Sequence, residues 1–480
     1  MSAVKKRMIL IQPYPENSAG VSSTTGSFPP LGLLVLDALT PKDKWDVEIV
    51  DESRNRFDVN MDTSNVSLVG ISLWTNQAPR AYGIAEVFRR RGIPVILGGP
   101  HPSIMPEEAM RYGDSVCVGE AESIWPTILE DFESDSLQRV YEGGVPNLDI
   151  VPVIKNPFTD AYRWGIVQTA RGCPYNCSFC SVTLINGRSM RYRPIEDVVE
   201  EFKNIKPRIV MVADDNFIGS GRRGRERAIE LCKALYELRK QGVRKYWGTQ
   251  CTQNLGQEDE VLKWMYKAGC RTVLFGLESI NKKVIKDMNK GINTPGDYAE
   301  NIRNTQRHGI TVVGSFIFGN DGDDENVFKD TLDFINEVGI GTQNVNISCP
   351  MPGTKLFSDM KAAGRLRYTN FPEDWEKYNL RYVTLEPKNL TPLELYKKRG
   401  EVAYKLTGSN LFLLKRFIRN LWDTRSPVAA VFALLWNRAC RDNKDEYEHQ
   451  INLLKQEEQA SMTEDIGVLQ LFSEHYSRRA

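Results

Sequence analysis

Three cysteines lie close together in the run Arg171-Gly-Cys173-Pro-Tyr-Asn-Cys177-Ser-Phe-Cys180. A short loop with this spacing can wrap its thiolates around one metal centre, and closely spaced cysteine thiolates normally hold iron–sulfur clusters. Three thiolates leave one iron of a four-iron cube open to a small-molecule ligand. The run therefore predicts a [4Fe–4S] cluster bound by Cys173, Cys177 and Cys180.

Other uses of these thiols fit less well. A structural zinc site needs a fourth ligand, and the next Cys or His along the chain is Cys232, on a predicted helix. A redox dithiol needs two cysteines rather than three. Most other cysteines lie in patterns typical of buried small hydrophobic residues. Cys349 is the exception, because it ends a predicted strand and would face the active site as a second ligand or a radical-quenching thiol.

A region of alternating strands and helices must position the cysteine run, which directly follows its first strand. The expected strands are 165–170, 209–213, 246–251, 272–277, 311–318 and 344–348, and the expected helices are 195–204, 224–241, 258–268, 295–308 and 325–338. Six strand–helix repeats predict a partial (β/α)6 barrel, because a full eight-stranded barrel usually needs about 250 residues. Functional groups of such a barrel lie at the carboxyl ends of its strands.

The N-terminal region shows the same alternation. Its expected strands are 7–13, 46–51, 68–73, 94–98 and 115–118, with helices at 31–39, 78–91 and 121–132. This pattern predicts a doubly wound parallel sheet of the Rossmann type, which binds ligands at the carboxyl ends of its strands. At these ends, Gly98, Gly99 and Gly119 would let a ligand approach the backbone closely. The hydroxyls of Ser72 and Thr75 could form hydrogen bonds with such a ligand.

The expected fold class is therefore α/β with a helical C-terminal part. The expected division is a first domain at 1–141, a linker at 142–164, a barrel at 165–385, and a helical domain with a tail at 386–480. The linker holds three prolines and two glycines and has no clear periodicity. Helices are expected at 391–406, 411–422 and 428–441.

Composition excludes several classes of protein. Lys and Arg number 62 and Asp and Glu number 62, so the balanced charge argues against nucleic acid or an anionic membrane as the main partner. No apolar run reaches the roughly 18 residues of a transmembrane segment, and the charged start predicts no secretory signal. Nine cysteines on such a chain favour thiols and thiolate ligands over disulfides. We expect a cytoplasmic protein, with peripheral attachment to a membrane left open.

The cysteine run at this place in a partial barrel resembles the radical S-adenosylmethionine (SAM) superfamily, over residues 165 to about 348. The resemblance implies that Cys173, Cys177 and Cys180 bind the cluster and that SAM chelates its open iron. Reduction would then cleave SAM to a 5′-deoxyadenosyl radical. The resemblance also places several residues at SAM, namely Phe179 near the adenine, Asp215, Glu278, Ser279, Gly314 and Gly319. A helix cap is the alternative role for Asp215, and close packing in a buried strand is the alternative role for the two glycines.

The N-terminal region resembles the cobalamin-binding domain that precedes many radical SAM barrels. The resemblance implies cobalamin at the strand ends, near Ser72, Thr75, Gly98, Gly99, Gly119 and Glu120. The loop after the first strand lacks the Asp-x-His-x-x-Gly motif of histidine-ligated cobalamin sites, and the only N-terminal histidine, His101, lies in another loop. Many members of this subfamily also lack the motif, so cobalamin is expected, with a vestigial domain as the alternative.

Together these resemblances imply a cobalamin-dependent radical SAM methyltransferase (class B) that acts on an unactivated carbon. One SAM would methylate the cobalamin, and a second would supply the radical that abstracts a substrate hydrogen. Radical cyclisation, oxidation or carbon–carbon coupling on the same scaffold stays open, as does a non-catalytic cobalamin or cluster sensor.

The expected partners are a small-molecule or lipid substrate and an external electron donor such as flavodoxin or ferredoxin. The helix at 411–422 interleaves aliphatic and aromatic residues with Lys415, Arg416 and Arg419. Such an amphipathic basic segment suits plain packing in a helical domain, a substrate lid or a lipid-facing patch.

Overall fold

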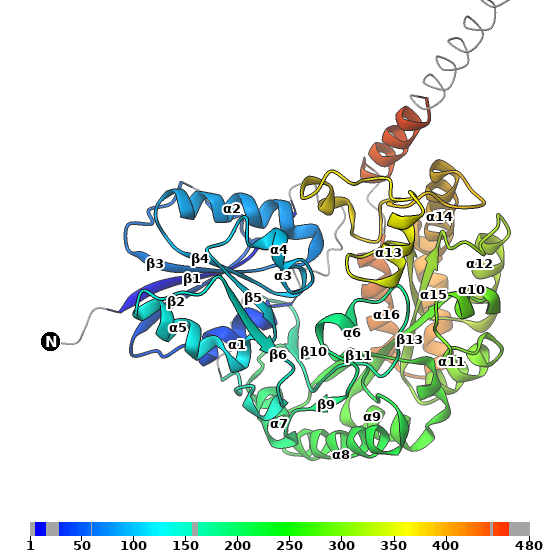
Figure 1. Cartoon of the computed structure of the whole chain (residues 1–480). Coiled ribbons are helices and arrows are strands. Elements are labelled where there is room, and N and C mark those ends of the chain that lie inside the picture. Colours follow the sequence, from blue (N-terminus) through cyan, green and yellow to red (C-terminus); the bar gives the residue numbers. More distant parts are fainter. Residues whose placement is uncertain (1–4, 16–27, 59, 156–161, 442–444, 460–480) are drawn as a thin grey trace, which may run out of the picture.

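The computed structural model describes residues 5–15, 28–58, 60–155, 162–441 and 445–459. Within these residues, two six-stranded sheets lie side by side, and helices from the C-terminal part pack against the second sheet (Figure 1). This arrangement confirms the expected α/β fold class, with a Rossmann-like first part, a partial barrel and a helical C-terminal part.

The first sheet has the strand order β2-β1-β3-β4-β5-β6, and all its neighbours are parallel. Its strands are β1 (Lys6–Gln12), β2 (Trp45–Asp51), β3 (Val66–Ser72), β4 (Val95–Gly98), β5 (Ser115–Gly119) and β6 (Val140–Gly144). Successive side chains point to opposite faces of a strand. Met8 and Leu10 therefore pack with α1 (Leu31–Leu39) and α5 (Trp125–Glu133). Ile9 and Ile11 pack with α2 (Ala78–Arg90) on the other face.

The edge strand β6 differs from the sequence-based expectation, which began a linker at residue 142. Its glycines are typical of a loop, but a Cβ at Gly143 would lie 1.8 Å from the carbonyl oxygen of Glu120. The close approach of β5 and β6 therefore selects glycine within a strand. The first sheet extends to Gly144 as a result.

The second sheet has the order β14-β13-β12-β11-β10-β7, and all its neighbours are parallel. Its strands are β7 (Gly165–Val167), β10 (Ile209–Val212), β11 (Tyr246–Cys251), β12 (Cys270–Glu278), β13 (Thr311–Phe318) and β14 (Thr342–Ile347). Five connecting helices alternate with them: α7 (Ile195–Asn204), α8 (Gly221–Lys240), α9 (Asp259–Ala268), α11 (Tyr298–Arg307) and α12 (Val327–Val338). A short helix, α10 (Lys282–Asp287), lies between β12 and α11, and the six strands with these helices form a partial barrel.

The first barrel strand is shorter than the sequence predicts. After β7 the chain turns into β8 (Ala170–Arg171), which pairs antiparallel with β9 (Arg191–Tyr192). The cysteine run lies between these two short strands, so a small separate ribbon anchors both ends of the loop.

The C-terminal part contains α14 (Pro392–Thr407), α15 (Asn410–Thr424) and α16 (Pro427–Ala439), and α16 packs against β12, β13 and β14. A helical segment at 445–459, red in Figure 1, follows them. Across the described ranges, we find no helix with both the length and the apolar character needed to cross a bilayer.

The chain between α13 (Lys355–Ala362) and α14 returns to the first domain. Trp375 and Tyr378 are buried in the same core as α2. The Trp375 indole donates to Glu108 Oε2 at 3.0 Å. The sequence analysis assigned this segment to the barrel. It packs instead against α2 of the first domain and so joins the first domain to the barrel.

Candidate active site

The cysteine run forms a loop at the carboxyl end of the barrel, between β8 and α6 (Val182–Ile185). Gly172 opens the loop with a φ of 94°, and a Cβ there would lie 2.3 Å from the Ser189 carbonyl oxygen, so glycine is required. The Gly172 amide donates to Asp215 Oδ2 at 2.8 Å, and Asn186 Nδ2 donates to the same oxygen at 2.9 Å. The end of the neighbouring strand β10 thus holds the loop in place.

The loop presents three free, partly buried thiols. Burial raises the pKa of each thiol, to about 11 for Cys180. The ammonium of Lys290 acts in the opposite direction on all three. Within the described residues, no three His, Cys, Asp or Glu side chains gather closely enough to hold a single metal ion.

A buried ion pair lies beside the loop. Glu278 ends β12 with a φ of 61°, a left-handed conformation that is uncommon outside glycine, and its carboxylate accepts a hydrogen bond from Lys290. The Lys290 ammonium also lies 5.7 Å from the centroid of the Phe179 ring. Burial opposes its charge, but Glu278 and the thiols of Cys177 and Cys180 hold the pKa of Lys290 above its usual value. The sequence analysis did not single out Lys290, because a lysine in a polar turn carries no distinctive pattern.

A cavity of about 600 Å³ opens beside the cysteine loop. Phe179, Cys180 and Glu278 line it from the barrel, and Trp74 and Asn76 line it from the first domain, just after β3. Its apolar walls include Ile317, Val345, Met351, Tyr378, Leu380 and Trp436. A molecule in this cavity would contact both domains.

The residues expected to contact SAM are only partly gathered there. Phe179 and Glu278 line the main cavity, and Gly319 lines a smaller cavity of about 150 Å³ that Phe179 also borders. Asp215, Ser279 and Gly314 line neither cavity.

Each of these three residues has a local structural role. Asp215 holds the cysteine loop, as described above. The Ser279 hydroxyl accepts from the Asn281 amide at 3.1 Å. A Cβ at Gly314 would meet Phe316 at 3.1 Å, within the packing of the sheet. Their contacts with SAM stay predictions.

A cavity of about 140 Å³ lies at the carboxyl ends of the first sheet. The predicted residues Ser72, Gly98, Gly99 and Gly119 all line it. Gly98 has no positive φ, and a Cβ there would meet nothing closer than Cys117 at 3.5 Å. Packing within the protein does not require glycine at this position, whereas a bound group in the cavity would.

Thr75 lies outside the lining of that cavity. Its buried hydroxyl lies 3.3 Å from Nδ1 of His101, whose Nε2 lies 3.0 Å from Glu108 Oε1. Glu108 also accepts a hydrogen bond from the indole N–H of Trp375. The histidine that no motif explained is therefore a buried link between the end of β3, α4 (Pro106–Ala109) and the segment that returns from the barrel.

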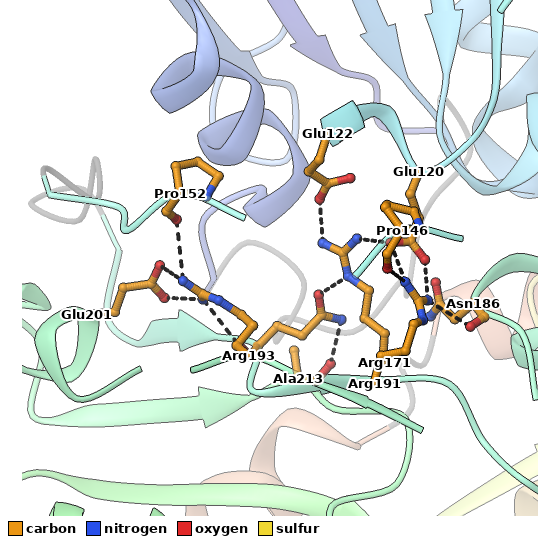
Figure 2. A network of polar contacts seen from close by, with 11 residues as sticks. Glu120, Glu122, Pro146, Pro152, Arg171, Asn186, Arg191, Arg193, Glu201 and Ala213 are labelled. Atoms are coloured by element: carbon orange, nitrogen blue, oxygen red, sulfur yellow. Dashed lines mark hydrogen bonds and ion pairs between the residues drawn. The ribbon is translucent and has the colours of Figure 1, made fainter. Parts of the chain in front are cut away.

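Glu120 lies between two arginines of the barrel domain, as Figure 2 shows. Arg171 Nη1 donates to Glu120 Oε2 at 2.5 Å, and Arg191 Nη1 donates to the same oxygen at 2.9 Å. Arg171 Nη2 donates to Glu122 Oε1 at 2.5 Å. Burial opposes the charge of Arg171, but the two carboxylates hold its pKa above the usual value. The carboxylate that the sequence assigned to the cofactor is thus engaged in joining the two domains.

Cys349 does not face the mouth of the site, contrary to the sequence-based expectation. It is buried in the core that contains Phe357 and Trp375, with its sulfur 3.7 Å from that of Met351. Burial raises the pKa of Cys349 to about 11. Met351 lines the main cavity and Cys349 does not, because the strand end turns the cysteine into the core.

The residues present fit the groups that the sequence resemblance implied. Three free thiols on one loop beside a buried cation suit an iron–sulfur cluster, whose usual ligands are cysteine thiolates. A glycine-lined cavity of about 140 Å³ at the strand ends of a doubly wound sheet suits one part of a large cofactor. Fold and site together define a class, namely a partial-barrel enzyme with a cysteine-bound cofactor and a preceding cofactor-binding domain.

Two family models match the chain. The radical SAM superfamily matches residues 167–335, and the B12 binding domain matches residues 18–129. Bacteriochlorophyllide d C-12(1)-methyltransferase of Chlorobaculum tepidum is 31% identical over 448 residues, which cover 87% of this chain and 94% of that protein. The hopanoid C-2 methylase of Rhodopseudomonas palustris is 28% identical over 352 residues, which cover 70% of this chain and 65% of that protein.

A solved structure shares the fold. The radical SAM methyltransferase TsrM of Kitasatospora setae, with cobalamin and a [4Fe–4S] cluster bound, has a TM-score of 0.63 at 16% identity, over 82% of each chain. The chain belongs to the radical SAM superfamily, in the branch with a B12-binding domain whose members include carbon methyltransferases. It is a radical SAM enzyme whose cofactors are a [4Fe–4S] cluster, SAM and cobalamin, as the sequence predicts.

Proposed function

We propose that this enzyme transfers a methyl group to an unactivated carbon of a largely apolar small molecule held in the cavity of about 600 Å³. The observation that carries the proposal is the position of this cavity. Phe179 and Cys180 of the cysteine loop line one side, and Trp74 and Asn76 of the first domain line another. When bound, the cluster with SAM supplies a 5′-deoxyadenosyl radical and cobalamin supplies the methyl group. A substrate carbon in the cavity would lie between the two sources.

The chain's own residues would hold the substrate and keep water away from it. Radical chemistry needs such shielding, because exposed intermediates undergo side reactions. Trp74, Tyr378 and Trp436 line the cavity with aromatic surface. The Trp436 indole donates to Asn344 Oδ1 at 3.0 Å, so a hydrogen bond fixes this wall to β14.

Two basic residues, Arg381 and Arg399, are part of the cavity lining. Arg399 lines it and is buried, and its Nε donates to the Val345 carbonyl oxygen at 2.9 Å. A buried guanidinium is suited to a carboxylate or carbonyl oxygen, because its fixed donors match those acceptors. We therefore propose a substrate with an apolar body and one oxygen-bearing group.

Methyl transfer is favoured over the other radical reactions of this scaffold. The named relatives are methyltransferases that together act on a pigment macrocycle and a hopanoid. This supports methylation rather than cyclisation, oxidation or carbon–carbon coupling. We also propose an external one-electron donor of the flavodoxin or ferredoxin type.

The test uses holoenzyme reconstituted without oxygen and assayed with methyl-labelled SAM, a reductant and extracts of apolar metabolites. We expect the label in a product, together with S-adenosylhomocysteine and 5′-deoxyadenosine. Cys177→Ala should lose iron and both SAM-derived products. Cys232→Ala, a buried cysteine on α8, is the matched control and should retain them. Deoxyadenosine without S-adenosylhomocysteine, across all extracts, would contradict methyl transfer.

A further inference from the structure

Helix α15 directs apolar side chains away from the protein. Leu411, Leu414, Ile418 and Trp422 follow one another at intervals of three and four residues, so they share one face of the helix. Their exposed fractions are 58%, 53%, 57% and 82%. We call these four residues the α15 apolar face.

The opposite side of α15 is mostly polar. Asn420 Nδ2 donates to Thr311 Oγ1 at 2.7 Å, and Arg416 Nη2 donates to Gln343 Oε1 at 2.8 Å. Leu413 is the apolar residue buried on this side. A surface helix normally buries its apolar stripe and exposes its polar one. Here polar contacts hold the helix to the barrel, so packing within the protein does not account for the α15 apolar face.

Exposed apolar side chains are concentrated in this part of the molecule. In the described chain, thirteen large apolar residues are exposed, and seven of them lie in α14, α15 and α16. Besides the α15 apolar face, these are Tyr404, Val431 and Leu435. Large exposed apolar patches on a folded protein mark sites of interaction.

Cations accompany the α15 apolar face. Residues 397–441 contain ten Lys or Arg and two Asp or Glu, in a protein whose net charge is zero. Lys415 and Arg419 are exposed on α15 and Arg425 is exposed at its end. An apolar helix face with flanking cations is suited to lie in the interface of an anionic bilayer, where apolar side chains enter the acyl boundary and cations meet phosphate groups.

A second copy of the chain would match this face less well. A two-fold contact places the same patch of both subunits together. Pairing the α15 apolar face with itself would bring Lys415 and Arg419 near their own counterparts, and like charges at a contact are unfavourable. An anionic surface has no such cost.

A further cavity lies beside α14. It measures about 520 Å³ and is lined by Tyr404, Gly408, Arg441 and Tyr447. Ala403 and Thr407 of α14 line both this cavity and the main one, so α14 borders both cavities. The Tyr404 ring lies 6.4 Å from that of Phe412, at the start of α15.

We propose that the α15 apolar face docks on an anionic membrane surface. The docked enzyme takes its apolar substrate from the bilayer through the cavity beside α14, a statement that rests on the proposed function. The docking itself does not depend on the reaction.

Co-sedimentation of the full chain with lipid vesicles tests the docking, without SAM or reductant. The probes are vesicles of phosphatidylcholine alone and vesicles with roughly one third phosphatidylglycerol. We expect binding to the anionic vesicles to exceed binding to the neutral ones about tenfold, since each cation near the surface adds to the attraction. The double variant Ile418→Gln, Trp422→Gln should lose most of this binding. Lys415→Gln with Arg425→Gln should lose the preference for anionic lipid.

The matched control is Val145→Gln. It removes an exposed apolar side chain directly after β6, outside the C-terminal helices. It should bind vesicles as the wild type does. Equal vesicle binding by wild type and the Ile418→Gln, Trp422→Gln variant would overturn the proposal. The proposal would also be overturned if light scattering showed that the wild type is a dimer and that the Ile418→Gln, Trp422→Gln variant is a monomer. If docking holds but no extract is methylated, the proposed function fails and the docking stands.

Discussion

Arg171 and Glu120 join the cysteine loop directly to the first sheet. Arg171 lies two residues before Cys173, Glu120 lies directly after β5, and their Nη1–Oε2 distance is 2.5 Å (Figure 2). The two side chains are 11% and 5% exposed. Because one partner precedes the cluster loop and the other follows a strand end of the cobalamin-binding domain, this ion pair fixes the relative position of the two cofactor sites.

Glu120→Gln should uncouple SAM cleavage from methyl transfer to the substrate. The variant removes the charge that faces Arg171 and Arg191, while Glu122 still pairs with Arg171. Removing one partner of a buried pair costs about 3–5 kcal/mol, and the retained partner should reduce the loss to about 2 kcal/mol of the free energy of unfolding. We expect SAM cleavage to deoxyadenosine to continue, and methylated product per deoxyadenosine to fall several-fold. Mass spectrometry of one reaction measures both.

Glu201→Gln is the matched control for this prediction. Glu201 and Arg193 form a buried pair at 2.8 Å, visible in Figure 2, but both belong to the barrel domain. The control should lose at least as much stability, because no second carboxylate among the described residues pairs with Arg193, and should keep the wild-type product ratio. An unchanged product ratio in Glu120→Gln would show that the interdomain pair does not position the cofactors.

Gly98→Leu should prevent cobalamin binding without unfolding the protein. Gly98 lines the cavity of about 140 Å³. Since a Cβ there meets nothing closer than 3.5 Å, the added side chain would occupy the cavity rather than disrupt the fold. We expect cobalt per chain to fall at least about tenfold, with iron per chain unchanged, because a side chain in a cofactor site excludes the cofactor sterically. Metal analysis of reconstituted protein measures both.

Gly83→Leu controls for the effect of adding a side chain. Gly83 lies on α2, where a Cβ would meet nothing within 4 Å, and it does not line the cavity. This variant should bind cobalt as the wild type does. Full cobalt occupancy in Gly98→Leu would place the cofactor elsewhere.

Lys290→Met should slow SAM cleavage about tenfold or more, because it removes a buried charge near an anionic cofactor and leaves Glu278 unpaired. Lys290→Arg keeps the charge and should restore most of the rate. A redox titration followed by electron paramagnetic resonance should show a lower cluster potential in Lys290→Met alone. Equal loss of activity in both variants, at an unchanged potential, would indicate a packing role instead.

The strands of both sheets were largely predictable from the sequence. The segments at 246–251 and 311–318 coincide with β11 and β13, since segments rich in β-branched and aromatic residues favour strands. The cysteine loop was equally clear, because its chemistry lies within ten consecutive residues. β6 was missed because its glycines serve a close backbone contact rather than a turn.

Contacts between distant segments were not predictable. Glu108 and Trp375 are separated by 267 residues, and nothing local in either segment indicates the other. Glu278 and Lys290 meet because the chain that contains α10 (Lys282–Asp287) folds back on the end of β12. Motifs therefore identified the cofactors, whereas the side chains that fix the cofactor sites relative to each other emerge only from the packed structure.

Asp214 should make stability depend on pH. Burial raises the pKa of this carboxyl to about 6, although Thr169 and Ala170 donate hydrogen bonds to it. The unfolded chain titrates it near the usual value of about 3.9, so the folded protein binds more protons between pH 4 and 6. The contribution of Asp214 is therefore fully present below pH 4 and is lost as pH rises through 6. Two pKa units correspond to about 3 kcal/mol.

The side chain in Asp214→Asn cannot titrate, so this variant isolates the contribution of Asp214 to the pH dependence of stability. The free energy of unfolding of the wild type minus that of Asp214→Asn should fall by about 3 kcal/mol between pH 4 and 7, measured by urea unfolding at each pH. Asp323→Asn should show the same trend, because burial also raises the pKa of Asp323 to about 6. Asp43→Asn, at an exposed site, is the control, and its difference from the wild type in the free energy of unfolding should change little with pH. A difference that stays flat with pH for Asp214→Asn would mean that its hydrogen bonds offset the cost of burying the charge.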